Sequence, residues 1–170
     1  GRYVGVGPTR RLGAELSGGL AGAGPLRLDG ALSFTDARRA ADGALLPYAP
    51  RLLGQAGVGV EALAIGAARA SGGLRVLALG PRPLPTGLWS ARRAQLDLRA
   101  ALRRGRLEAA LDVDNLLGQA IHDGEFVFAS DWRPQDGSAS ALDARHISFG
   151  PPRALSLSLA VHPQARGAAP

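Results

Sequence analysis

Apolar and polar residues alternate along most of this chain, and this period-two pattern limits its possible folds more than any other feature. Successive side chains of a β-strand point to opposite faces, so the pattern indicates strands with one apolar and one polar face. It predicts seven strands, at Arg11–Leu20, Leu26–Thr35, Arg51–Val60 and beyond, Leu74–Leu79, Arg93–Leu102, Leu107–Asp114 and Ala154–Val161. The expected fold class is all-β and antiparallel.

The predicted connections alternate between short and long. Tight turns are expected at 21–25, 70–73 and 103–105, and long loops at 36–50, 80–90 and 115–150. One end of the sheet would then carry only turns and the other only loops. Outer-membrane barrels have short periplasmic turns and longer extracellular loops, whereas soluble sandwiches have no such sidedness as a rule. The pattern therefore predicts about seven strands of a transmembrane β-barrel.

The composition agrees with this fold and excludes several chemistries. The 24 glycines disfavour long helices, and the chain has no run of about 18 apolar residues that would predict a transmembrane helix. Cysteine is absent, which excludes thiolate metal sites and cysteine nucleophiles. The net charge is +6 and every basic residue is arginine, so anionic partners are favoured. The arginines fall near strand ends or on polar faces, avoiding a cost of about 2–4 kcal/mol at mid-bilayer.

Four segments carry a family resemblance, and they occur in the family's order. Residues 3–16 are similar to the strand entry N-x-G-x-x-R-x-x-G-x-E, and 33–38 with 46–51 are similar to a Y-T-x-x-x-A … V-P-x-x-P-x-H loop. Residues 112–118 are similar to V-x-N-L-F-D, and 150–159 to the closing P-G-x-P-R strand. Together they resemble the C-terminal part of the β-barrel of TonB-dependent outer-membrane receptors.

The resemblance implies a role in the cell outer membrane, namely TonB-dependent uptake of a scarce solute such as an iron–siderophore complex or cobalamin. The implied partners are outer-membrane lipid and lipopolysaccharide, the solute, and the TonB complex through an N-terminal plug that these residues do not include. Residues 1–162 would be barrel, and 163–170 a disordered tail. The chain departs from the family at its last strand, which ends Val161-His162-Pro163 instead of on an aromatic residue.

The long loops hold the candidate ligand-binding residues. These are Tyr48, Trp89, Trp132, Arg133 and His146. Aromatic and cationic side chains together suit an anionic, ring-bearing solute. We expect no catalytic activity, no cofactor, no resident metal and no nucleic-acid partner, because basic residues are not interleaved with aromatic ones as such a partner requires.

Other motifs have simpler interpretations. Residues 57–62 mimic a dinucleotide-binding glycine motif, but the following glycines argue against the helix that it needs. Residues 112–115 lack the Gly and Glu that complete a calcium loop. His122, Asp123 and His146 could bind a metal, but solvated loop histidines are the favoured interpretation.

Two alternative architectures remain open from the sequence. One is a self-contained eight-stranded outer-membrane barrel with a structural or adhesion role, in which Tyr3–Val6 belongs to an eighth strand. The other is a soluble β-sandwich that acts as a binding module.

Overall fold

The computed structural model describes residues 7–131 and 141–163, and almost all of their regular structure is β. The strands are β1 (Thr9–Ala21), β2 (Leu26–Arg39), β3 (Leu52–Ile65), β4 (Ala68–Leu79), β5 (Arg93–Arg104), β6 (Leu107–Asp114), β7 (His122–Asp131), β8 (Ala141–Phe149) and β9 (Ala154–Val161). A 3-10 turn, η1, covers Pro85–Gly87. Every strand pairing is antiparallel, which confirms the expected all-β class.

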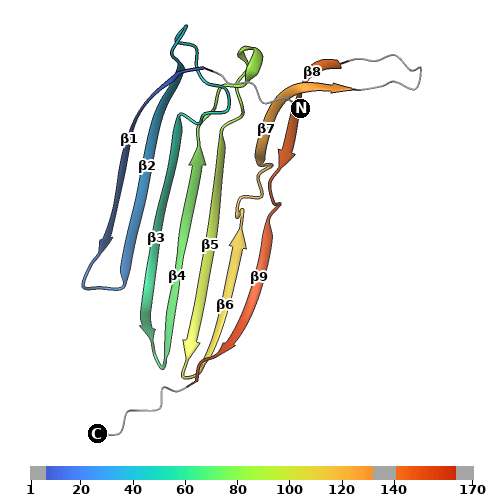
Figure 1. Ribbon diagram of the computed structural model, residues 1–170. Helices are drawn as coiled ribbons and strands as arrows, with labels where there is room; N and C mark the ends of the chain where they lie inside the picture. The colour runs from blue at the N-terminus through green and yellow to red at the C-terminus, as the bar shows by residue number, and fades with distance from the viewer. Residues whose placement is uncertain (1–6, 132–140, 164–170) are drawn as a thin grey trace.

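Within the described residues, seven strands form one open sheet in the order β1-β2-β3-β4-β5-β6-β9 (Figure 1). Neighbours in sequence are neighbours in the sheet until β6, beside which β9 returns. Strands β7 and β8 form a separate two-stranded sheet, the hairpin, which lies beyond the top of β6 in Figure 1. The edges of the large sheet are β1 and β9, so the described sheet is not closed on itself.

The sheet has two distinct ends. The turns between β1 and β2, β3 and β4, and β5 and β6 lie at the bottom of Figure 1, which we call the turn end. The connections from β2 to β3 and from β4 to β5 lie at the top with the hairpin, which we call the loop end. The expected alternation of short and long connections is therefore confirmed for these strands.

The register places most of the large apolar residues of the seven strands on one side of the sheet, which we call the apolar face. Residues directly opposite each other in an antiparallel pair share a face, and Leu16 lies opposite Leu32, as Leu111 lies opposite Leu157. The large members of this face are Leu12, Leu16, Leu20, Leu26, Leu28, Leu32, Phe34, Leu52, Val58, Val60, Leu63, Ile65, Leu74, Val76, Leu96, Leu98, Leu102, Leu107, Leu111, Val113, Leu155, Leu157, Leu159 and Val161.

No second layer of the described chain covers the apolar face. Leu159 on the edge strand is 81% exposed, and most large side chains of this face are exposed. Buried apolar side chains occur instead mainly at the loop end, where Ala37, Leu84, Ile121 and Val127 pack. The described chain thus has a small core at the loop end and an uncovered apolar face below it.

The opposite side, which we call the polar face, is mixed. Charged residues occupy its middle and turn end, for example Asp29, Arg75 and Asp97. Leu53 and Leu79 lie opposite each other nearer the loop end. The two faces therefore differ most strongly over the middle of the sheet.

The expected loop at 115–150 is wrong, because it contains the hairpin. Phe126, Val127 and Phe128 are consecutive apolar residues, so the hairpin uses both of its faces and shows no simple alternation. The loop expected at 36–50 also begins later, because β2 continues to Arg39.

The turn expected at 70–73 is also wrong, because these residues lie inside β4. The chain turns at Gly66, whose φ is 57°. A register shift between Val60 and Leu63 explains why the alternation slips there. Ala62 in this bulge has a φ of 51°, and its N–H donates to the Ser71 hydroxyl at 3.1 Å.

The close approach of β4 and β5 gives a test of this register. A Cβ on Gly72 would lie 2.7 Å from the carbonyl oxygen of Arg99, whereas one on Gly18 would have nothing within 4 Å. We expect Gly72→Ala to lower the free energy of unfolding by about 1–3 kcal/mol, because β4 must shift. Gly18→Ala should leave it unchanged or raise it by up to about 1 kcal/mol. Denaturant titration followed by far-ultraviolet circular dichroism measures both, and equal effects would contradict the register.

Candidate functional site

The site lies at the loop end, where two loops meet the hairpin. Residues 40–51 connect β2 to β3, and residues 80–92 connect β4 to β5. Both loops form hydrogen bonds with β7 or β8. We call the contact region the hairpin dock and define it by Tyr48, Arg82, Ala91, Glu125 and Arg145.

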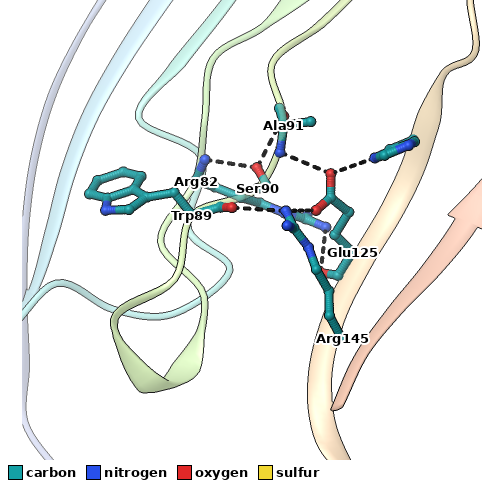
Figure 2. Close-up of polar contacts among 7 residues, drawn as sticks. Arg82, Trp89, Ser90, Ala91, Glu125 and Arg145 are labelled. Atoms are coloured by element: carbon teal, nitrogen blue, oxygen red, sulfur yellow. Dashed lines mark hydrogen bonds and ion pairs between the residues drawn. The ribbon is translucent and has the colours of Figure 1, made fainter.

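The centre of the hairpin dock is the carboxylate of Glu125, which is 2% exposed. Its Oε1 accepts a hydrogen bond from the Ala91 N–H at 2.9 Å and lies 3.0 Å from His122 Nδ1. Its Oε2 forms an ion pair with Arg145 (Figure 2). A buried carboxylate is tolerated only where charges and donors compensate for its lost hydration, and these three groups do so.

The balance of these effects sets the protonation state of Glu125. Burial alone raises the pKa of a carboxyl group. Here the hydrogen bonds from Ala91, His122 and Arg145, with the charge of Arg145, outweigh burial and hold the pKa of Glu125 below its usual value. Glu125 is therefore an anion at neutral pH.

Two arginines extend this contact to the β4–β5 loop (Figure 2). Arg145 Nη2 also donates to the carbonyl oxygen of Trp89 at 2.9 Å. Arg82 Nη2 donates to the carbonyl oxygen of Glu125 at 3.2 Å. The loop is closed by Ser90, whose N–H donates to the Arg82 carbonyl at 2.9 Å and whose hydroxyl accepts from the Arg82 N–H at 3.0 Å. The loop is thus held on both sides of its 3-10 turn.

Tyr48 attaches the β2–β3 loop to the same hairpin. Its hydroxyl donates to the Val127 carbonyl at 3.0 Å and lies 3.2 Å from the Val127 N–H, which donates to it. Its own N–H donates to the Pro83 carbonyl at 2.7 Å. Tyr48 has a φ of 66°, a left-handed conformation that is costly for a bulky residue. These three bonds hold it there.

Aromatic side chains form the side of the hairpin next to Tyr48. The rings of Tyr48 and Phe126 are 5.7 Å apart, and the Arg82 guanidinium also lies 5.7 Å from the Phe126 ring centre. His146 stacks on Phe128 with centroids 3.7 Å apart and 7° between planes, and its Nε2 lies 2.8 Å from the Ser130 hydroxyl. Phe126 and Phe128 remain exposed. Exposed rings can stack on a planar ligand, and the neighbouring guanidinium can pair with an anionic group.

A hollow adjoins Tyr48 on the polar face. It has a volume of about 680 Å³ and is bordered by Thr35, Leu46, Tyr48, Leu53 and Pro85, among other residues. A hollow of this size is within the range of small-molecule sites, about 300–1,000 Å³. Tyr48 therefore lies between this hollow and the aromatic side of the hairpin.

The structure describes three of the five predicted ligand-binding residues. Tyr48, Trp89 and His146 come from three different elements, and each contacts or belongs to the hairpin. The Trp89 side chain is 45% exposed, and only its carbonyl is used in the dock. Trp132 and Arg133 lie outside the described residues, as does most of the predicted tail, from 164 onward.

The sequence analysis did not identify Glu125, Arg82 or Arg145. The sequence contained one signal for Glu125, which directly precedes three consecutive apolar residues. Such a run indicates a strand with apolar residues on both faces, and a carboxylate beside it is expected to be buried. The three residues that could have bound a metal each have a different partner. His122 contacts Glu125, Asp123 pairs with Arg93, and His146 stacks on Phe128. Among residues 7–131 and 141–163, no group of three His, Asp or Glu side chains could hold a metal ion.

No protein-family model matches the chain, and no curated protein matches it. None of the helical structure in the described residues is long and apolar enough to cross a membrane.

The lowered pKa of Glu125 predicts an acid-sensitive hairpin. A carboxyl whose pKa is lower in the folded state stabilises that state above the usual glutamate range, and this contribution is lost as pH falls through the lowered pKa. We expect hydrogen exchange over 122–130, corrected for its intrinsic pH dependence, to accelerate on acidification. Glu125→Gln should accelerate it already at neutral pH by roughly thirtyfold, corresponding to about 2 kcal/mol, and abolish the acid dependence.

Glu108→Gln is the matched control, because Glu108 pairs with His162 at the turn end, away from the hairpin. It should leave exchange over 122–130 unchanged at every pH. Acid-dependent exchange that persists in Glu125→Gln would assign the effect to another group.

Proposed function

We propose that this chain forms part of the membrane-spanning β-barrel of an outer-membrane receptor that takes up a scarce solute, such as an iron–siderophore complex or cobalamin, with energy supplied through TonB. The observation that carries this proposal is the apolar face, which continues across all seven strands of the sheet.

The length of the apolar face matches a bilayer. Apolar or small residues occupy every position of this face from Leu12 to Leu20 in β1 and from Leu26 to Phe34 in β2, about nine residues in each strand. A transmembrane strand needs about 9–11 residues. In water an exposed apolar surface of this extent is unfavourable, whereas in lipid it is at its preferred place.

Charged residues limit this face at both ends. Among the described residues, Arg10, Asp36 and Arg38 lie on it at the loop end, and Arg104 lies on it at the turn end. The polar face instead carries charges in mid-strand, such as Asp97 and the Arg99–Asp112 pair at 3.6 Å. Mid-strand charges are tolerated in the water-filled interior of a barrel and are costly on its lipid side.

Two of the four segments that resemble the receptor family meet in the structure. Asn115 is 1% exposed, and its Nδ2 donates to the carbonyl oxygens of Gln119 at 2.9 Å and Pro151 at 3.4 Å. The segment at 112–118 therefore contacts the one at 150–159, where β9 begins. This junction supports a shared structural role for the two segments.

The proposal assigns the ends and edges of the sheet. The loop end, with Tyr48, Trp89 and His146, would lie outside the cell and contact the solute, together with Trp132 and Arg133. Unpaired backbone groups at an edge cost several kcal/mol each in lipid, so β1 and β9 would pair with further strands of the same barrel.

The orientation of the faces can be tested with spin labels, because the chain has no cysteine of its own. Leu98 lies on the apolar face in mid-strand, and Arg99 on the polar face next to it. We expect a label at Leu98→Cys in lipid vesicles to collide with dissolved oxygen and not with a water-soluble nickel complex, with the reverse at Arg99→Cys. Low collision with both reagents at Leu98→Cys would instead indicate a soluble sandwich core, and a label at Asp42→Cys controls for solvent access.

The transport role is tested in cells. A strain with the intact gene should accumulate radiolabelled ferric siderophore or cobalamin at least about tenfold faster than a strain without it, because diffusion alone does not concentrate a scarce solute. The advantage should disappear when TonB is deleted. Accumulation independent of the gene or of TonB for a panel of such solutes would contradict the transport role and leave the membrane topology to the spin-label result.

A further inference from the structure

A hollow lies on the polar face at the turn end, over β3, β4, β5 and β6. It has a volume of about 540 Å³, within the range of about 300–1,000 Å³ that small-molecule sites occupy. Small residues lie at its centre, where Ser71 of β4 is opposite Ala101 of β5. We call it the turn-end hollow, and the charged side chains that border it are Arg69, Arg99, Arg103 and Glu108.

The three arginines of the turn-end hollow have unused hydrogen-bond donors. Arg69 forms no hydrogen bond or ion pair with the described residues. Within the same part of the chain, Arg103 donates only from Nε, to the Gly105 carbonyl at 3.3 Å, which leaves its two terminal nitrogens for a ligand. Arg99 lies 3.6 Å from Asp112, which is too far for a hydrogen bond. The described fold therefore uses few of these donors.

The arrangement of charge favours a bound anion. Arg69 lies directly opposite Arg103, and like charges at such positions destabilise a strand pair. Glu108 lies on the other side of Arg103, but its Oε2 is 2.8 Å from Nε2 of His162. Two carboxylates, those of Glu108 and Asp112, face three guanidinium groups, so at least one positive charge is left uncompensated. An anion between the two opposed arginines would replace their repulsion with attraction.

The hydroxyl of Ser71 adds a neutral donor at the centre of the hollow. It accepts a hydrogen bond from the Ala62 N–H at 3.1 Å, and no residue that the structure describes accepts its proton. Ala62 lies in the bulge of β3 with a φ of 51°, and bulges of this kind re-aim side chains and are over-represented at functional sites. The bulge thus holds the Ser71 oxygen in place and leaves its proton for a ligand.

We propose that the turn-end hollow binds a small phosphate monoester, with its phosphate group between Arg69, Arg103 and Ser71. Guanidinium groups donate two parallel hydrogen bonds to phosphate oxygens. Donors on two strands and at the centre of the hollow suit the tetrahedral oxygens of a phosphate better than the two in-plane oxygens of a carboxylate. The volume of about 540 Å³ leaves room for the organic part of the ester. This inference goes beyond the proposed function, which assigns no ligand to the turn end.

The test variant is Arg69→Gln, which removes a guanidinium group without a partner in the described fold. The matched control is Arg104→Gln. Arg104 follows Arg103 at the same end of β5 but lies on the apolar face, and it too has no hydrogen bond or ion pair among residues 7–131 and 141–163. Both variants lose one positive charge at the turn end, so only a defined site on the polar face distinguishes them.

The measurement is equilibrium dialysis of radiolabelled glycerol phosphate against the full chain in dodecyl maltoside micelles, which contain no phosphate. We expect saturable binding that weakens at least about tenfold in Arg69→Gln and less than about twofold in Arg104→Gln, because only the first loses a direct charge-assisted contact. Unlabelled inorganic phosphate should displace the label, whereas acetate at the same concentration should not. Denaturant titration without phosphate should find Arg69→Gln at least as stable as the natural chain, since it removes a like-charge contact.

Several results would overturn the phosphate site. Equal weakening in the two variants would show a general attraction of anions to the basic turn end. Displacement by acetate or sulfate at least as effective as displacement by phosphate would remove the phosphate assignment. Absence of saturable binding to the natural chain, or a less stable Arg69→Gln, would contradict the unused donors on which the inference rests. None of these results changes the spin-label test at Leu98, so the proposed function stands or fails separately.

Discussion

The register of the seven-stranded sheet is the constraint on which the rest of the structure depends. Side chains alternate with a period of two, so a slip of one residue would turn every leucine of a strand to the polar face. The bulge between Val60 and Leu63 shows how strict this requirement is. It adds one extra residue to β3 and shifts the register, and Leu63 and Ile65 then continue the apolar face that Val58 and Val60 began. The irregularity preserves the face.

At the loop end, the buried carboxylate of Glu125 fixes how the loops and the hairpin are arranged. Two long loops and a hairpin have few apolar residues with which to specify a single arrangement, and Val127 and Leu84 are among the few that are buried. A buried carboxylate with partners on the β4–β5 loop and on both hairpin strands is satisfied in one arrangement only, because a displaced hairpin would leave a buried charge unpaired. The buried carboxylate thus favours one arrangement of the hairpin and the β4–β5 loop over displaced ones.

The sequence predicts local pattern well and distant partners poorly. The strands at 93–102 and 107–114 are evident because each has one apolar face, which the register confirms. The hairpin carries apolar residues on both of its faces, so its sequence does not alternate between apolar and polar residues. Tyr48 was identified as an exposed-loop aromatic residue, but its hydroxyl bonds a residue 79 positions away. Glu125 and Ala91 are 34 positions apart, and no local pattern connects them.

The last residues of strand β2 lie alternately on the apolar face and on the polar face. Asp36 and Arg38 lie on the apolar face, whereas Thr35 and Ala37 border the hollow beside Tyr48. In the proposed receptor, the end of β2 would contact lipid with its apolar face and the solute with its polar face. The alternation of a single strand keeps the two contacts independent, since no side chain reaches both faces. A change at Asp36 would then alter the lipid contact, and a change at Thr35 the hollow.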